Sequence, residues 1–353
     1  MSDPRTLVLA FAGDAPSAGA IGQLAERLSA DIATVTLDLG QGGDLEQVRE
    51  QSIAAGAARA HVVDARERFA GEILLPVLRA GAAHPAATTP ASLARPMVVT
   101  VLIEIARMER AFGIAHGATG EARAAIERLI ADAAPDLAVI ALEDVAPIPA
   151  TGQPKVSANL WGRLVRLPAT ARDEAPDRSL YSRTTDPLAG HPHPAVVELS
   201  FERGQPTAIN GIPMRFPELV EVLDTIAGDH GVGRADRTRR GTSGMKREIA
   251  ESPAAVTLSA ALDEIERAAL DTRLLTLKTS LEPHYAALVN EGGWFSSARF
   301  AVDAFNDSAM AAISGTVRVM LFRGGCRIVG CEVGPISAIE HTVKDIGAAQ
   351  TAI

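Results

Sequence analysis

Thiol and imidazole side chains are the first candidates for chemistry, because both bind metals and both can act as nucleophiles or bases. The two cysteines, Cys326 and Cys331, lie within the segment GCRIVGC. Five residues apart on a strand, their side chains are expected on opposite faces. A metal site would need more ligands than the neighbouring sequence offers, so no metal is expected, and reduced, packed thiols are predicted. His116 and His230 are isolated, and a hydrogen-bonded structural role competes with a role as base or ligand.

The first part of the chain must position any site, and it alternates short apolar segments with helical periodicity. Strands are expected at 6–11, 32–37, 60–63 and 113–115, and helices at 20–29, 45–55, 67–80 and 91–112. Such alternation predicts an α/β region with a parallel sheet covered by helices. Ligands bind these sheets at the carboxyl ends of the strands. The turns after Phe11, Leu37 and Ala115 are therefore the candidate binding positions.

The second part has an α+β pattern. Residues 145–194 are rich in Pro, Asp, Arg and Thr, which favours a crossover with partial order around 159–163. Beyond it, strands are expected at 195–201 and 207–209, helices at 216–228 and 254–275, and a hairpin of strands 314–322 and 327–333 around Gly324–Gly325. The predicted boundaries are 1–150 for the α/β domain, 151–194 for the crossover and 195–353 for the α+β domain.

Composition excludes several classes of function. The chain has 353 residues, of which 47% are hydrophobic, and a formal net charge of −9. A nucleic-acid-binding protein would show a basic surface instead. No stretch approaches the roughly 18 apolar residues that span a membrane, and the N-terminus lacks the long apolar run of a signal peptide. A soluble cytoplasmic protein without nucleic-acid or membrane partners is expected.

Eight segments together resemble the argininosuccinate synthase family, in its order and at nearly its spacing. They are VLAFAG near the start, LDLGQGGDLEQVRE at 37–50, SLARP at 92–96, AHGATG at 115–120, NLWGR at 159–163, HGVGR-x-D at 230–236, GWFSSAR at 293–299 and GTVRV at 315–319. The resemblance implies an N-terminal ATP-pyrophosphatase-type (HUP-like) domain with a parallel sheet, a C-terminal α+β synthetase domain, and a homotetramer. In that family ATP, with Mg²⁺, adenylates the ureido oxygen of citrulline, and the aspartate amine then displaces AMP.

The resemblance also implies a nucleotide loop between the first strand and the first helix. The family's loop reads Ser-Gly-Gly-x-Asp-Thr-Ser, whose glycines, hydroxyls and helix N-terminus hold phosphate. The matching positions here are Ala12, Gly13, Asp14, Ala15, Pro16, Ser17 and Ala18, with Gly117 also on the nucleotide side. Asp14 places a carboxylate where phosphate would lie, and Pro16 removes a backbone donor. Either a metal bridges Asp14 and phosphate, or Asp14 or Ser17 caps an ordinary helix.

The positions that match the family's amino-acid contacts are mostly substituted. Two are retained, Ser92 and Thr119. The substituted positions are Ala87, Arg123, Ala124, Glu127, Lys155, Leu164, Arg239 and Ala250. Arg123 and Glu127 alternatively form an exposed i,i+4 pair on an amphipathic helix. Among matched residues outside these contacts, Arg95 and Arg163 are expected to pair with carboxylates, and Trp161 and Trp294 to be packed.

These substitutions leave three functional hypotheses, and no catalytic residue is assigned. The first is a degenerate paralogue with the family fold and no ATP-dependent citrulline–aspartate ligation, serving as a binding or partner protein. The second is a ligase of the same type for an anionic substrate, with Arg123, Lys155 and Arg239 forming a cationic pocket. The third is a true argininosuccinate synthase of arginine biosynthesis. The short segment 338–353 favours a dimer or a loose tetramer.

Overall fold

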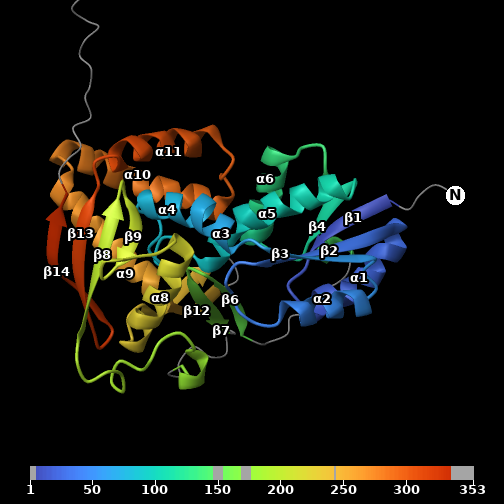
Figure 1. Ribbon diagram of the computed structural model, residues 1–353. Helices are drawn as coiled ribbons and strands as arrows, with labels where there is room; N and C mark the ends of the chain where they lie inside the picture. Colours follow the sequence, from blue (N-terminus) through green and yellow to red (C-terminus); the bar gives the residue numbers. More distant parts are fainter. Residues whose placement is uncertain (1–4, 146–153, 168–175, 242–243, 335–353) are drawn as a thin grey trace, which may run out of the picture.

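The computed structural model describes residues 5–145, 154–167, 176–241 and 244–334. A parallel sheet with its helices lies at one end of the molecule, and the antiparallel sheets with the C-terminal helices lie at the other (Figure 1). The tail at 338–353, on which the expected oligomer depended, lies outside the described residues. Within the described ranges, no helix is long and apolar enough to cross a membrane.

The first sheet is parallel and has the strand order β3-β2-β1-β4-β5. Its strands are β1 (Arg5–Ala10), β2 (Ala30–Asp38), β3 (Arg59–Asp64), β4 (Gly113–His116) and β5 (Ala138–Ala141). The helices of this part are α1 (Ala15–Leu28), α2 (Leu45–Ala54), α3 (Arg66–Arg68), the π-helical turn η1 (Phe69–Leu74), α4 (Leu75–Arg79), α5 (Pro90–Met108), α6 (Glu121–Ala133) and α7 (Leu142–Val145). The predicted parallel α/β sheet is thus confirmed.

Alternation along β1 explains why helices cover both faces of this sheet. Leu7 and Leu9 belong to one buried cluster with Ile21 of α1, whereas Val8 points to the opposite face and belongs to the cluster that contains Met97 of α5. Figure 1 shows α1 and α2 on one side of the sheet and α5 and α6 on the other. Strand order reverses between β1 and β4, and such a switch point is where ligands bind in open α/β sheets.

Two antiparallel sheets form the second part. The five-stranded sheet has the order β10 (Ile212–Pro213), β9 (Gln205–Ile209), β8 (Ala195–Glu202), β13 (Gly315–Phe322), β14 (Gly325–Val333), and the four-stranded sheet has the order β11 (Arg234–Gly241), β12 (Gly244–Glu251), β7 (Gly162–Leu167), β6 (Lys155–Asn159). The helices are α8 (Phe216–Asp229), α9 (Pro253–Ala269), α10 (Thr272–Glu291) and α11 (Ser297–Met310), with a short 3₁₀ turn η2 (Arg178–Leu180). The α+β pattern and the hairpin at Gly324–Gly325 are confirmed.

The single helix expected at 254–275 is wrong, because the chain forms two helices there. The helix α9 ends at Ala269, and Asp271 starts α10 by accepting hydrogen bonds from the amides of Arg273 (2.8 Å) and Leu274 (3.0 Å). An aspartate that caps in this way competes with continuation of the preceding helix. The periodic apolar pattern ran through this break and concealed it.

The prediction that the two cysteines point to opposite faces is also wrong. Both pack against the core, Cys326 opposite Leu321 and Cys331 opposite Val317. The pairing of β13 and β14 shifts by one residue after Arg318, so that one extra residue lies between the cysteines. A bulge of this kind reverses the alternation of side chains beyond it. Both thiols are free.

A buried carboxylate connects the segment before β8 to the four-stranded sheet. Glu251 of β12 is fully buried and accepts hydrogen bonds from the amides of Ser182 (3.0 Å), Arg183 (2.9 Å) and Thr184 (3.0 Å) and from the hydroxyl of Thr184 (2.8 Å). Arg163 of β7 donates to the same carboxylate at 3.0 Å, which confirms its expected carboxylate partner. Residues 182–184 are therefore held in place, whereas the sequence predicted order in the crossover only around 159–163.

A second buried cluster lies between α9 and α10. The ammonium of Lys278 contacts a carboxylate oxygen of Glu266 at 3.0 Å and one of Glu282 at 3.4 Å, and the Lys278 and Glu266 side chains are almost fully buried. Burial raises the pKa of Glu266 to about 7, although Lys278 acts in the opposite direction. Folding therefore favours the protonated carboxyl group.

This raised pKa predicts a specific pH dependence of stability. The folded protein binds the Glu266 proton more tightly than the unfolded chain does, and this tighter binding adds to the free energy of unfolding. The added stability is fully present below about pH 4.5 and is lost as pH rises through 7. It is on the order of 3 kcal/mol. The variant Glu266→Gln lacks this titration and should gain stability relative to wild type between pH 4.5 and 8. Urea unfolding measures the difference, with Glu46→Gln on the surface as control. Parallel pH profiles for wild type and Glu266→Gln would contradict the assignment.

Candidate functional site

The carboxyl ends of β1, β2 and β4 surround a cavity of about 590 Å³, which we call the strand-end cavity. Phe11, Leu37 and Gly117, from the three predicted turns, line it. The α2 N-terminus, the start of α5 and residues 156–158 of β6 (Lys155–Asn159) complete its wall. Three turns that are distant in sequence thus meet at one place.

The loop from β1 to α1 is built as a helix cap. Gly13 has a φ of +80°, and a side chain on it would approach Val48 to 3.0 Å, so glycine suits the turn on both grounds. The next residue, Asp14, is the N-cap of α1, and its Oδ1 accepts from the amide of Ser17 at 3.0 Å. The cap predicted as one alternative for Asp14 is present in the structure. Ala12 is exposed and Ser17 is buried.

A second aspartate caps the other helix at this cavity. Asp44 is the N-cap of α2, and its Oδ1 accepts from the amide of Gln47 at 3.0 Å. Sequence reasoning missed this residue, although the Gly42–Gly43–Asp44 turn after β2 carried the signal. Among the described lining residues, Asp14 and Asp44 are the charged ones, and both are acidic.

This arrangement does not fit a bound polyphosphate. Phosphates bind helix N-termini through free amides, and here each aspartate side chain already accepts from one first-turn amide, that of Ser17 or that of Gln47. A phosphate at about 4 Å from a carboxylate is repelled by roughly 4 kcal/mol per pair of unit charges at an effective dielectric constant of 20. The described lining supplies no Lys or Arg to offset this repulsion. Among the described residues, no cluster of three or more His, Cys, Asp or Glu is arranged to hold a metal.

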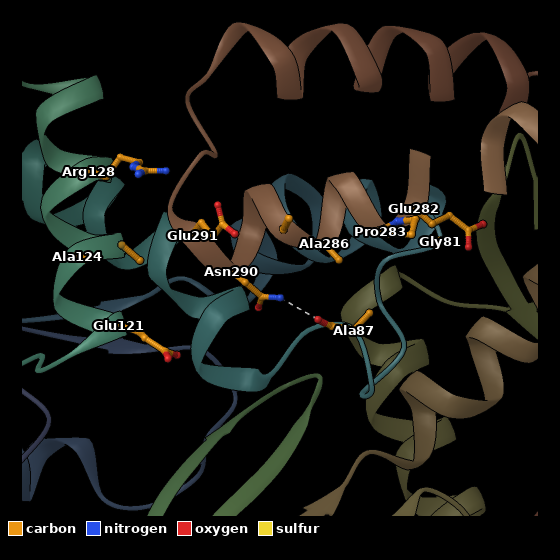
Figure 2. Close-up of a pocket in the computed structure, with 12 residues that line it drawn as sticks. Gly81, Ala87, Glu121, Ala124, Arg128, Glu282, Pro283, Ala286, Asn290 and Glu291 are labelled. Atoms are coloured by element: carbon orange, nitrogen blue, oxygen red, sulfur yellow. Dashed lines mark hydrogen bonds between the residues drawn. The ribbon is translucent and has the colours of Figure 1, made fainter. Parts of the chain in front are cut away.

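A larger cavity of about 800 Å³ lies between α6 and α10, and we call it the helix cavity (Figure 2). Ala87 and Ala124, two of the substituted positions, line it. The amide of Asn290 donates to the carbonyl of Ala87 at 2.8 Å, as the dashed line in Figure 2 shows. Its charged lining residues are Glu121, Arg128, Glu282 and Glu291.

Arg123 does not add positive charge to either cavity. Its guanidinium contacts the carboxylates of Glu127 (2.7 Å), Glu143 (2.7 Å) and Asp144 (2.8 Å). These hydrogen bonds raise the pKa of Arg123 above its ordinary value, and the bond to Asp144 has the largest effect. The predicted i,i+4 pair of Arg123 and Glu127 is confirmed. Glu127 is held within this ion-pair network.

The other two members of the predicted cationic pocket are not brought to Arg123. Lys155 is exposed at the beginning of β6, opposite Arg166 of β7. Arg239 lies in β11 opposite Lys246 of β12, and its side chain is outside the described part of the structure. Arg95 donates to the backbone carbonyl of Asn290 at 2.9 Å rather than to a carboxylate.

The remaining substituted positions surround a third, small cavity of about 70 Å³, which we call the small cavity. Leu164 and Ala250 are buried neighbours on β7 and β12, and Ala87 completes the apolar wall. Arg237 of β11 also lines this cavity. Sequence reasoning missed Arg237, because it lies just beyond the matched HGVGR-x-D segment.

The two retained contact positions differ in accessibility. Ser92 is buried, and its hydroxyl accepts from the amide of Thr89 (2.9 Å) and donates to the carbonyl of Thr89 (3.0 Å). It therefore completes the capping box of α5. Thr119, in contrast, is exposed before α6. Trp161 and Trp294 are buried, as predicted.

The two histidines have different environments. His230 makes the expected hydrogen bond, between its Nδ1 and the carbonyl of Ile226, at 2.9 Å. His116, at the end of β4, is buried, and neither ring nitrogen has a hydrogen-bond partner among the described residues. Its Nε2 lies 4.0 Å from Glu127. Desolvation lowers the pKa of His116, so the ring is neutral at pH 7.

Comparison with known proteins covers both parts of the chain. Residues 6–147 match the family described as Arginosuccinate synthase N-terminal HUP domain, and residues 156–338 match the Arginosuccinate synthase C-terminal domain. The argininosuccinate synthase of Oceanobacillus iheyensis is 33% identical, covering 92% of this chain and 84% of the relative. That of Pelotomaculum thermopropionicum is 34% identical, covering 97% and 91%.

The role of Asp14 as a cap predicts how its variants behave. Asp14→Ala removes the acceptor for the Ser17 amide and should lower the free energy of unfolding by about 1 kcal/mol. Asp14→Asn keeps a capping oxygen and should remain close to wild type. Urea unfolding of the three proteins compares them directly. A stability gain in Asp14→Ala would instead identify Asp14 as a strained residue retained for binding.

Proposed function

The chain belongs to the argininosuccinate synthase family, and from this premise we propose that it is a ligand-binding member that does not perform ATP-dependent citrulline–aspartate ligation. One observation carries the proposal. The N-terminus of α1, in the loop that departs from the family's sequence, is capped by the chain's own Asp14. Asp44 caps α2 in the same way, but it lies within the segment 37–50 that resembles the family. One first-turn amide of α1, that of Ser17, and the positive end of the helix dipole are therefore already matched with negative charge. ATP would meet the Asp14 carboxylate where the family's loop has a glycine.

The amino-acid side supports the same proposal. At the positions that match the family's contacts, Ala87, Ala124, Leu164 and Ala250 offer methyl and methylene groups where a zwitterion needs hydrogen bonds. Arg123 and Glu127 are paired with each other. Holding two reactants in attack geometry can account for about 7–11 kcal/mol of a reaction barrier. Without these contacts the ligation would lose most of that contribution.

A second candidate is a true argininosuccinate synthase, and the comparisons favour it. The relatives that match nearly the whole chain carry that name. Asp14 and Asp44 also provide two carboxylates at the strand-end cavity, and Mg²⁺ is commonly bound by one or two carboxylates together with substrate phosphates. On this candidate, ATP binding would depend strictly on Mg²⁺ and on the charge of Asp14.

We expect no ATP binding at micromolar concentration, with or without Mg²⁺, because the loop repels phosphate. Isothermal titration of the purified protein measures this. Asp14→Asn is the matched variant, since it removes the charge and keeps the cap. Micromolar affinity that requires Mg²⁺ and disappears in Asp14→Asn would refute the proposal and establish the second candidate's ATP site.

Rebuilding the loop should restore nucleotide binding but not synthesis. The variant combines Ala12→Ser, Asp14→Gly, Pro16→Asp and Ala18→Ser. It removes one carboxylate from the cap, returns a backbone donor and returns two hydroxyls, each worth about 1 kcal/mol as a neutral hydrogen bond. ATP binding is measured by titration, and ligation by argininosuccinate formation from citrulline and aspartate.

Robust argininosuccinate formation by this variant would show that the amino-acid contacts are supplied by other residues. The control is the same four-residue change combined with Gly117→Val, which narrows the nucleotide side of the strand-end cavity. The homo-oligomer expected from the family resemblance stays a prediction and is separate from these assays.

A further inference from the structure

The small cavity contains a cation that the proposed function does not use. It lies where residues 85–90 meet β7, β11 and β12. Arg237 lines it together with Thr89 and Ser252, and Ala87, Leu164 and Ala250 supply the apolar wall. We propose that this cavity binds a small carboxylate anion through the Arg237 guanidinium. The proposal names a ligand class for the binding protein inferred above, and it rests on that function.

The Arg237 guanidinium has unused hydrogen-bonding capacity. Its Nη2 donates to the carbonyl of Pro85 at 3.0 Å. Its Nε is buried and has no acceptor among the described residues. Within the described part of the chain, no carboxylate lies within 4.0 Å of its nitrogens as an ion-pair partner. A buried donor on a charged group is costly to leave unpaired, so an external acceptor would stabilise it.

Two cations and one carboxylate lie in a row beside the small cavity, so their net charge is positive. Arg166, Glu248 and Arg237 occupy one cross-strand row on β7, β12 and β11. The carboxylate of Glu248, which also lines the cavity, accepts from Nε of Arg166 at 2.8 Å. Arg166 thus offsets the charge of Glu248, and the positive charge of Arg237 remains for a ligand.

The size of the cavity and its donors favour a carboxylate over larger anions. One water needs about 10–15 Å³ of such volume, so a cavity of about 70 Å³ accommodates only a few heavy atoms. A planar carboxylate matches the fork of a guanidinium. A sulfate or phosphate ion is bulkier, and a doubly charged one would be repelled more strongly by Glu248.

Acetate is the test ligand. Arginine side-chain ¹⁵N spectra of the full-length protein are recorded during titration with sodium acetate, with chloride replaced to keep ionic strength constant. We expect one protected Nε–H resonance to shift saturably, and that resonance to be absent from Arg237→Lys. By calorimetry, Arg237→Gln should weaken acetate binding at least about tenfold. The matched control is Arg273→Gln, an exposed arginine on α10 that should leave binding unchanged.

Several results would overturn the proposal. These are a resonance that does not respond to acetate, an equal response to sulfate at the same ionic strength, or acetate affinity that is unchanged in Arg237→Gln. Where Arg237→Gln fails to fold, the wild-type titration still decides the question, with the resonance assigned from Arg237→Lys. Neither experiment contains ATP, so absence of acetate binding would leave the ATP-binding result standing, and ATP binding would leave the acetate result standing.

Discussion

A helix N-terminus has a limited number of free amide donors, and at the strand-end cavity Asp14 uses one of those of α1, the amide of Ser17. The parallel sheet brings the turns after β1, β2 and β4 together, and in such sheets this is the edge where ligands bind. Two helices begin there, α1 and α2, and one amide in the first turn of each donates to an aspartate of the chain itself, Asp14 or Asp44. One of the amides that could bind phosphate at each helix is therefore already bonded within the chain.

The scaffold around this edge is held by interactions that do not require a ligand. Glu251 of β12 is fully buried and accepts from the backbone amides of residues 182–184 and from Arg163. It therefore holds the segment before β8 against the four-stranded sheet. Ser92 matches a substrate contact, yet its hydroxyl completes the cap of α5. Both groups of contacts therefore stabilise the fold without a ligand.

Much of the fold was accessible from the sequence, because its signals are local. Short apolar or β-branched runs located β1, β2 and β4, and the Gly324–Gly325 turn located the hairpin of β13 and β14. The polar strands β11 and β12 were missed, since RADRTRRG and GMKREIAE lack alternation and are joined partly by an ion pair between Arg247 and Asp236. The cysteine orientation failed because one bulge, invisible in a local pattern, reverses the side-chain alternation.

The candidate site was predictable only in part, for a related reason. The sequence located the strand ends and the altered loop. It did not show which ion-pair partner each charged side chain has in the folded protein. The sequence suggests Arg123 as part of a cationic pocket. In the structure its guanidinium instead donates to Glu143 and Asp144, which lie about 20 residues later in the chain. Arg237 carried no signal in the sequence, because its importance depends on a cavity formed by strands from distant segments.

We propose that the Ser17 amide in the first turn of α1 is held by Asp14 and does not bind phosphate. The ¹H–¹⁵N amide resonance of Ser17, which donates to Asp14 at 3.0 Å, reports on this directly. During titration with ATP and Mg²⁺ to millimolar concentration, the account predicts that this resonance stays in place. A saturable shift of the Ser17 amide at micromolar ATP, with loss of its hydrogen bond to Asp14, would contradict the account.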